Sequence, residues 1–167
     1  QIEKYREKWD KDPEVIFLEN HGLIITHDDA ETSLEINKEI NANIKSYLGI
    51  YESYPQVGLE KISSDTYRSG TEYLQDYFRN HEIDEDFFNQ ILYPDQLVYL
   101  ENSVAVDGGE SRINIDSNSG EIIYNAKYNE AKTIDETMTA FVYIREYIEN
   151  NDLTLKTMPQ EYVDLIK

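Results

Sequence analysis

Three histidines, His21, His27 and His81, are the side chains of this sequence best suited to bind a metal or to exchange protons near neutral pH. His21 lies in a polar break, Glu19-Asn20-His21-Gly22, between two short apolar runs. The glycine in this break tolerates backbone angles that other residues avoid. A histidine in a turn between two buried strands would be held by a rigid scaffold while its ring faces a cleft.

A single histidine does not define a metal site, because catalytic zinc takes three protein ligands. His21 and His27 bracket one predicted strand, and their spacing places both side chains on one face of it. The ends of that strand are about 20 Å apart, so the two rings cannot share one ion. His21 is therefore either a turn residue that hydrogen-bonds the backbone or one ligand of a larger site. His81 is expected to be a solvated loop residue.

The acidic runs Asp28-Asp29 and Asp84-Glu85-Asp86 each fall at a predicted helix start. Carboxylates complement the helix dipole there, so capping explains them better than catalysis does. The sequence contains no nucleophile-elbow, zinc-protease, phosphate-loop or EF-hand motif. It also contains no cysteine, which excludes disulfides, a thiolate nucleophile and a cysteine metal site.

The residues around His21 predict a strand–turn–strand–helix unit. Residues 15–18 and 23–25 are short, nearly continuous apolar runs, as expected of strands buried on both faces. Asp28 with Glu31 resembles a capping box and predicts a helix that ends near Leu48, before Gly49. This helix carries an apolar stripe at four-residue spacing, formed by Ile36, Ile40, Ile44 and Leu48.

Periodicity and turn residues predict the other elements. The predicted helices are 2–11, 65–80, 84–92 with Asp84 as N-cap, one from a Thr133/Glu136 capping box to Asn150, and 159–166. The predicted strands are 97–100 and 103–106, followed by a hairpin of 111–116 and 121–125, and residues 52–64 are expected to be a connection.

Charge is the strongest compositional feature of the 167 residues. Fifteen Lys and Arg against 34 Asp and Glu give a net charge of −19, which repels phosphate backbones and argues against nucleic-acid binding. No apolar run approaches the roughly 20 residues that span a membrane, and the lack of cysteine suits the cytoplasm. The helix predicted from Ile2 has no visible cap, which favours a fragment of a longer protein over a mature end left by processing.

Residues from Pro13 to about Leu48 resemble the class II aldolase/adducin family. The matching motif is Pro13-Glu14-Val15-Ile16-Phe17-Leu18-Glu19-Asn20-His21-Gly22-Leu23-Ile24-Ile25, followed by Asp28 and a helix with acids in its first turn. The stretch Tyr93-Pro94-Asp95-Gln96-Leu97-Val98-Tyr99 is similar to a segment of larger bacterial members. His27 stands where a glycine is common in the family, and the helix opens Asp28-Asp29-Ala30-Glu31 rather than with the usual Glu-Ala pair.

This resemblance implies an α/β fold, with a three-layer αβα sheet of which residues 1–50 form the C-terminal part. Residues 51–167 would be a helical and β-hairpin extension of the same domain, with α+β character. The resemblance further implies that His21 is the third histidine of a catalytic zinc site. The other two come from a His-x-His motif, accompanied by an acid, and this sequence contains no His-x-His. The chain would then be a C-terminal portion that does not hold zinc alone.

The implied activity of the intact protein is retro-aldol cleavage of a small sugar phosphate by a homo-oligomer, with Glu19 or Asn20 orienting the His21 ring. One alternative is a non-catalytic, adducin-like interaction domain that keeps the fold without metal. Another is an epimerase or a dehydratase on the same scaffold. A His-x-His motif and an acid in the preceding sequence would distinguish the enzyme from the interaction domain.

Overall fold

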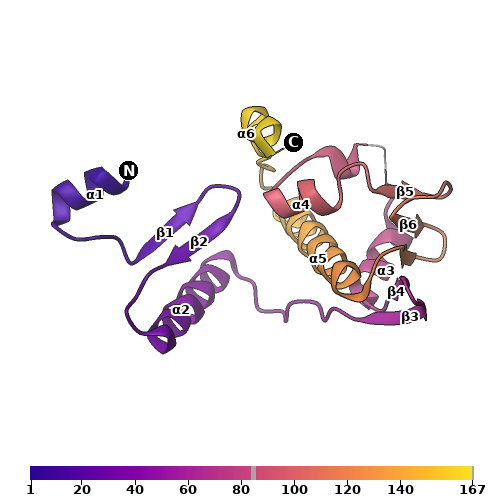
Figure 1. Ribbon diagram of the computed structural model, residues 1–167, viewed down its shortest axis with the longest axis horizontal. Helices are drawn as coiled ribbons and strands as arrows, with labels where there is room; N and C mark the ends of the chain where they lie inside the picture. Colours follow the sequence, from indigo (N-terminus) through magenta and orange to yellow (C-terminus); the bar gives the residue numbers. More distant parts are fainter. Residues whose placement is uncertain (84–85, 167) are drawn as a thin grey trace. The chain divides into compact units, whose positions relative to one another are not determined.

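The computed structural model describes residues 1–83 and 86–166, and the chain divides into two compact units, Gln1–Tyr54 and Pro55–Lys167 (Figure 1). We refer to these as the N-terminal unit and the C-terminal unit. Helices and strands occur in both units, so the chain is a mixed α/β protein, as the sequence predicts. Among the helices that the structure describes, none is long and apolar enough to cross a bilayer.

The N-terminal unit contains the predicted strand–turn–strand–helix order. Its elements are α1 (Ile2–Trp9), β1 (Val15–Leu18), β2 (Gly22–Ile25) and α2 (Ala30–Leu48). The two strands form an antiparallel hairpin in which Val15 lies opposite Ile25 and Leu18 lies opposite Gly22. Helix α2 ends at Gly49, where a left-handed φ of 70° lets the Gly49 amide donate to the Ser46 carbonyl. The predicted end of this helix is confirmed.

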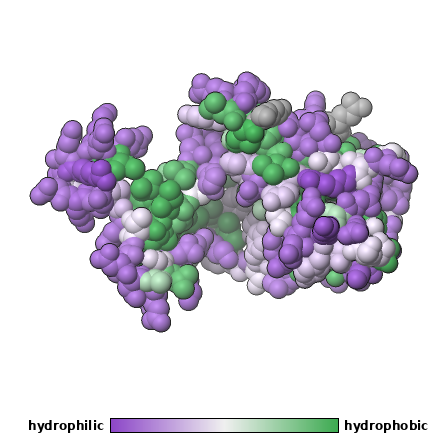
Figure 2. All heavy atoms as spheres, viewed as in Figure 1, coloured by the Kyte–Doolittle hydropathy of each residue, from purple (hydrophilic) through white to green (hydrophobic). Residues whose placement is uncertain are grey.

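The expectation that these strands are buried on both faces is wrong for this chain. None of residues 1–54, all of which the structure describes, is buried. Phe17 is 65% exposed and Ile24 is 44% exposed, and Figure 2 shows a cluster of hydrophobic residues over the hairpin. The continuous apolar pattern is typical of strands, as observed, but the side chains of β1 and β2 are at most half-buried.

The C-terminal unit is built on a five-stranded sheet. Its strands are β3 (Leu59–Ser63), β4 (Thr66–Ser69), β5 (Val104–Val106), β6 (Ile113–Asp116) and β7 (Glu121–Tyr124). Their order across the sheet is β3-β4-β7-β6-β5. All neighbours are antiparallel except β5 and β6, which run parallel. The predicted hairpin is therefore confirmed as β6–β7, and the predicted strand at 103–106 is confirmed as β5.

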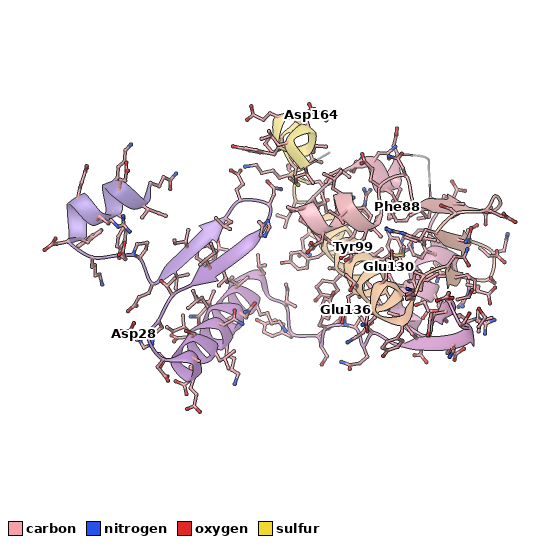
Figure 3. All side chains as sticks on the ribbon, in the orientation of Figure 1. Asp28, Phe88, Tyr99, Glu130, Glu136 and Asp164 are labelled. Carbon is pink, nitrogen blue, oxygen red and sulfur yellow. The ribbon has the colours of Figure 1, made fainter. Side chains whose placement is uncertain are left out.

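The long helix α5 supplies much of the core that packs with this sheet. The helical elements of the unit are α3 (Glu72–Asn80), the 3₁₀ turn η1 (Phe87–Asn89), α4 (Pro94–Tyr99), α5 (Tyr128–Asn150) and α6 (Gln160–Ile166). Inward side chains of α5 join buried residues of β6, β7, α3 and η1 in one cluster, which includes Phe78, Phe88, Ile113, Ile122, Tyr124, Ile134, Met138 and Phe141. Figure 3 shows Glu130 and Glu136 on α5 and Tyr99 at the end of α4.

The predicted helix 65–80 is wrong over its first turns. Residues 66–69 form β4, which pairs with β3 and β7, and helix α3 begins only after Thr71. Burial of Tyr67 and Ser69, two residues apart, has the period of a strand. The Gly70 amide donates to the Gly58 carbonyl at 2.8 Å, which continues the pairing of the two chain segments. Strand β3 likewise lies inside the predicted connection 52–64.

The predicted strand 97–100 is also wrong, because this segment belongs to helix α4. Pro94 occupies an early helical position, where its missing N–H costs no helical hydrogen bond. The buried Gln96 side chain fixes the helix: its oxygen accepts from the Leu92 amide at 2.7 Å, and its nitrogen donates to the carbonyls of Phe88 and Gln90. A polar residue that binds three main-chain groups carries no signal in hydrophobic periodicity.

Three further helices differ from or agree with their predicted bounds. Helix α5 begins at Tyr128 rather than at the predicted Thr133/Glu136 capping box, and the Thr133 hydroxyl donates to the Asn129 carbonyl inside the helix. Of the predicted helix 84–92, the described part contains only the short turn η1, and its expected N-cap Asp84 lies outside the described residues. The last predicted helix is confirmed as α6.

Candidate functional site

The turn of the β1–β2 hairpin holds His21 in an exposed position. The His21 amide donates to the Leu18 carbonyl at 3.2 Å and closes the turn. Asn20 has a left-handed φ of 57° and Gly22 has a φ of 137°, a value that side-chain-bearing residues rarely adopt. This local strain explains the residue types around His21: asparagine and glycine are among the residues that tolerate these angles best.

The residues that the structure describes do not assemble a metal site around His21. Among them, no group of three His, Asp or Glu side chains could hold an ion. A catalytic zinc needs three protein ligands, so this set does not fit the zinc site that the family resemblance implies. His21 stands as one potential ligand, and we derive no catalytic step through a metal.

His27 has a structural role at the start of α2. Its Nδ1 accepts a hydrogen bond from the Asp29 amide at 3.0 Å. His27 also lines two surface pockets of the N-terminal unit, one shared with α1 and one with α2. The structure therefore brings His27 to a helix start.

Asp29, rather than Asp28, caps helix α2. The Asp29 carboxylate accepts from both the hydroxyl and the amide of Thr32, each at 2.7 Å, and these hydrogen bonds hold the pKa of Asp29 below its ordinary value. Asp28 lies one residue earlier, in the loop before the helix (Figure 3). The capping explanation for this acidic pair is confirmed with a shift of one residue.

His81 is at the C-terminal end of α3. Its ring stacks on Tyr77, with centroids 4.1 Å apart and planes inclined by 13°, and its Nδ1 donates to the Tyr77 carbonyl at 2.8 Å. The residue is exposed, as predicted. The last acidic run, Asp84-Glu85-Asp86, falls largely outside the described residues, so its predicted capping role stays a prediction.

The C-terminal unit also contains a buried carboxylate that sequence patterns do not predict. The side chain of Asp135, on α5, accepts hydrogen bonds from three hydroxyls: Ser69 at 2.6 Å, Thr71 at 2.5 Å and Tyr124 at 2.6 Å. All four residues are fully buried. None of the ion pairs among the described residues includes Asp135. This hydroxyl–carboxylate cluster joins β4, the start of α3, β7 and α5.

The electrostatics of this cluster follow from burial. Desolvation raises the pKa of Asp135 above its ordinary value, against the opposing effect of its three hydroxyl donors. Burial and the adjacent Asp135 carboxylate raise the pKa of Tyr124 well above its ordinary value. Because the cluster is closed to solvent, it serves structure rather than substrate chemistry. One signal was available in the sequence: Asp135 lies between Ala131 and Met138 on the inward face of α5.

No protein-family model matches this chain, and neither the curated proteins nor the solved structures contain a significant match. Assignment of function therefore depends on the residues and their geometry alone.

Proposed function

We propose that the chain is part of a class II aldolase-family protein and that His21 is one ligand of its catalytic zinc. The observation that carries this proposal is the geometry of the β1–β2 turn. The positive φ angles of Asn20 and Gly22 hold a tight turn from which an exposed imidazole projects. The order strand, Asn-His-Gly turn, strand and capped helix is the order that the resembling family places at its third zinc ligand.

The exposure of the hairpin supports a larger sheet around it. Apolar side chains lie on both faces of β1 and β2, including Phe17 and Ile24, and none of them is buried. Strands with this pattern are typical of sheets that are covered on both faces. We therefore propose that the missing N-terminal portion of the domain supplies neighbouring strands and covering helices, which would complete a three-layer αβα arrangement.

The reaction that this proposal assigns is retro-aldol cleavage of a small sugar phosphate in the cytoplasm by a homo-oligomer. The remaining zinc ligands, a His-x-His pair and an acid, would come from residues outside this sequence. By itself the chain is expected to hold no zinc stoichiometrically and to have little aldolase activity.

The test compares two histidine variants in the gene product that contains this chain. Zinc content by atomic emission should be near one per subunit in the parent protein and in His27→Ala, and near zero in His21→Ala. His27→Ala is a matched control because His27 follows the same hairpin by two residues and already accepts a main-chain hydrogen bond. Retained zinc in His21→Ala would contradict the proposed ligand.

The alternative function is a non-catalytic, adducin-like interaction domain. The exposed apolar hairpin favours this alternative as well, because such a surface can bind another protein chain. The two functions differ in the coding sequence that precedes residue 1 and in metal content. A preceding sequence without His-x-His, together with a zinc-free gene product, would exclude the aldolase and leave the interaction domain.

A further inference from the structure

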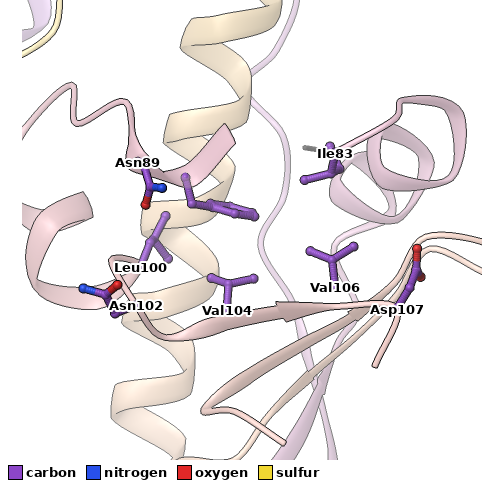
Figure 4. Close-up of a pocket in the computed structure, with 8 residues that line it drawn as sticks. Ile83, Asn89, Leu100, Asn102, Val104, Val106 and Asp107 are labelled. Carbon is purple, nitrogen blue, oxygen red and sulfur yellow. The ribbon is translucent and has the colours of Figure 1, made fainter. Parts of the chain in front are cut away.

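A pocket of about 410 Å³ lies in the C-terminal unit between edge strand β5 and the 3₁₀ turn η1 (Figure 4). Its size falls within the range of small-molecule sites. Five apolar side chains line it: Ile83, Phe88, Leu100, Val104 and Val106. Its polar lining residues are Asn89 and Asn102 at one end and Asp107 at the other, as Figure 4 shows.

The apolar wall is available because the sheet ends at β5. Among the described strands, β5 pairs only with β6. Val104 and Val106 are two residues apart, so their side chains point to the same face of the strand. Both are half-buried, as is Ile83 across the pocket. The pocket is thus a gap at the rim of the main core, where an apolar group would gain contacts without displacing a buried side chain.

The polar end of the pocket is held in place by local hydrogen bonds. The carboxylate of Asp107 accepts from the Ser117 amide at 2.7 Å and from the Ser117 hydroxyl at 2.6 Å. Each carboxylate oxygen can accept a further hydrogen bond. The backbone at Asp107 has a left-handed φ of 53°, which ends the strand and fixes the residue at the pocket rim.

Charge determines which ligands fit. Of the described residues that line the pocket, Asp107 alone is ionisable, and the chain carries a net charge of −19. A phosphate or carboxylate ligand would meet no cation there, whereas an ammonium group could bind the Asp107 carboxylate through a charge-assisted hydrogen bond. We propose that this pocket binds small amphipathic amines, with the apolar body against Val104 and Val106 and the ammonium group at Asp107.

This site is independent of the proposed aldolase function, since its ligand is a cation and its residues belong to the other unit. The first experiment titrates ¹⁵N-labelled chain with 2-phenylethylamine near neutral pH and follows amide shifts by NMR. Saturable shifts are expected at residues 102–107. The matched probes are 3-phenylpropionate, which is similar in shape and opposite in charge, and neutral 2-phenylethanol. Both should bind at least about tenfold more weakly, since each loses the charge-assisted contact.

Two variants assign the contact to Asp107. Asp107→Asn keeps the side-chain shape and an oxygen for Ser117 but removes the charge, and it should weaken amine binding about tenfold. Asp152→Asn is the control, because Asp152 is another exposed aspartate with a left-handed φ, and it should bind like the parent chain. Equal binding of the amine and 3-phenylpropionate, unchanged binding in Asp107→Asn, or shifts confined to other residues would each overturn the proposal. The comparison of probes on the parent chain decides the question even if Asp107→Asn fails to fold.

Discussion

Asp135 shows how one buried polar residue can organise several elements at once. Burying a carboxylate is costly unless its acceptor capacity is used. Here three hydroxyls from three different segments donate to it, and the Thr71 hydroxyl in turn accepts from the Gly58 amide at 3.1 Å. Residues on β4, β7 and α5 must therefore all be in place before the group is satisfied. Such a network stabilises the native arrangement relative to other packings of the same segments.

The pH dependence of folding should reveal this group. Because burial raises the pKa of Asp135 in the folded protein, the native state keeps a proton that the unfolded chain loses. Its contribution to stability is fully present below the ordinary aspartate pKa and is lost as pH rises through the raised pKa. The free energy of unfolding of the parent chain relative to Asp135→Asn should therefore fall with rising pH across this window. Urea unfolding at a series of pH values measures the difference.

Asp116 provides a control of opposite sign. Hydrogen bonds from Ser119 and Asn118 lower the pKa of this exposed residue, so its contribution is present above the ordinary aspartate pKa and is lost as pH falls. The free energy of unfolding of the parent chain relative to Asp116→Asn should then rise with pH. A difference for Asp135→Asn that also rises with pH would mean that the three hydroxyls outweigh burial.

At the scale of elements, the tip of the β6–β7 hairpin is locked onto helix α3. The Arg79 guanidinium donates to the Ser119 carbonyl through Nε at 3.1 Å and Nη2 at 3.0 Å. A Cβ atom on the next residue, Gly120, would lie 2.1 Å from the Gln75 carbonyl oxygen, and Gly120 has a φ of 72°. Only glycine allows the hairpin to approach the helix backbone this closely.

Gly120→Ala is expected to destabilise the C-terminal unit by more than about 3 kcal/mol, because it adds a backbone clash to the strain of a positive φ. The control is Gly109→Ala. Gly109 also has a positive φ, 91°, but the nearest atom to its added Cβ would be 3.7 Å away. Gly109→Ala should lower the free energy of unfolding by only about 1 kcal/mol. Chemical denaturation monitored by circular dichroism measures both, and equal losses would show that the clash relaxes without cost.

Local signals account for the elements that the sequence predicts well. The β6–β7 hairpin alternates apolar and polar residues around a Gly-containing turn, and α2 has a stop glycine, so both can be read within one segment. Strand β4 differs from its prediction because pairing with the distant strand β7 decides it, so a tertiary contact overrides local preference. Helix α4 differs for a local reason: the Gln96 side chain bonds main-chain groups four to eight residues earlier, and such bonds leave no trace in hydrophobic periodicity.

The same distinction applies to the candidate sites. His21 could be selected from the sequence because its neighbours, Asn20 and Gly22, are turn-forming residues and its own type binds metals. The hydroxyl–carboxylate cluster of Asp135 could not be assembled in advance, since its donors are more than sixty residues away on β4 and at the start of α3, or on the separate strand β7. The pocket beside β5 also requires knowledge of which strand forms the edge of the sheet.

Buried residues are distributed very unevenly between the two units. Every buried residue of the described chain belongs to the C-terminal unit. The N-terminal unit offers a two-stranded hairpin and helices without any buried side chain, whereas a two-stranded sheet is marginally stable in water unless it packs against other elements. Apolar burial therefore contributes much less to the stability of the N-terminal unit than to that of the C-terminal unit.

Hydrogen exchange followed by mass spectrometry should separate the two units in this chain. Amides of β1, β2 and α2 are expected to exchange at least about a hundredfold faster, relative to their intrinsic rates, than amides of β6, β7 and α5, because their local unfolding costs far less free energy. Phe17→Ser is the accompanying variant: Phe17 is exposed, so the denaturation midpoint of the C-terminal unit should not change. Strong protection of residues 15–25 would show that the hairpin is already covered in solution. In a longer gene product that contains the proposed N-terminal portion, the same amides should become protected, and Phe17→Ser should then destabilise the protein.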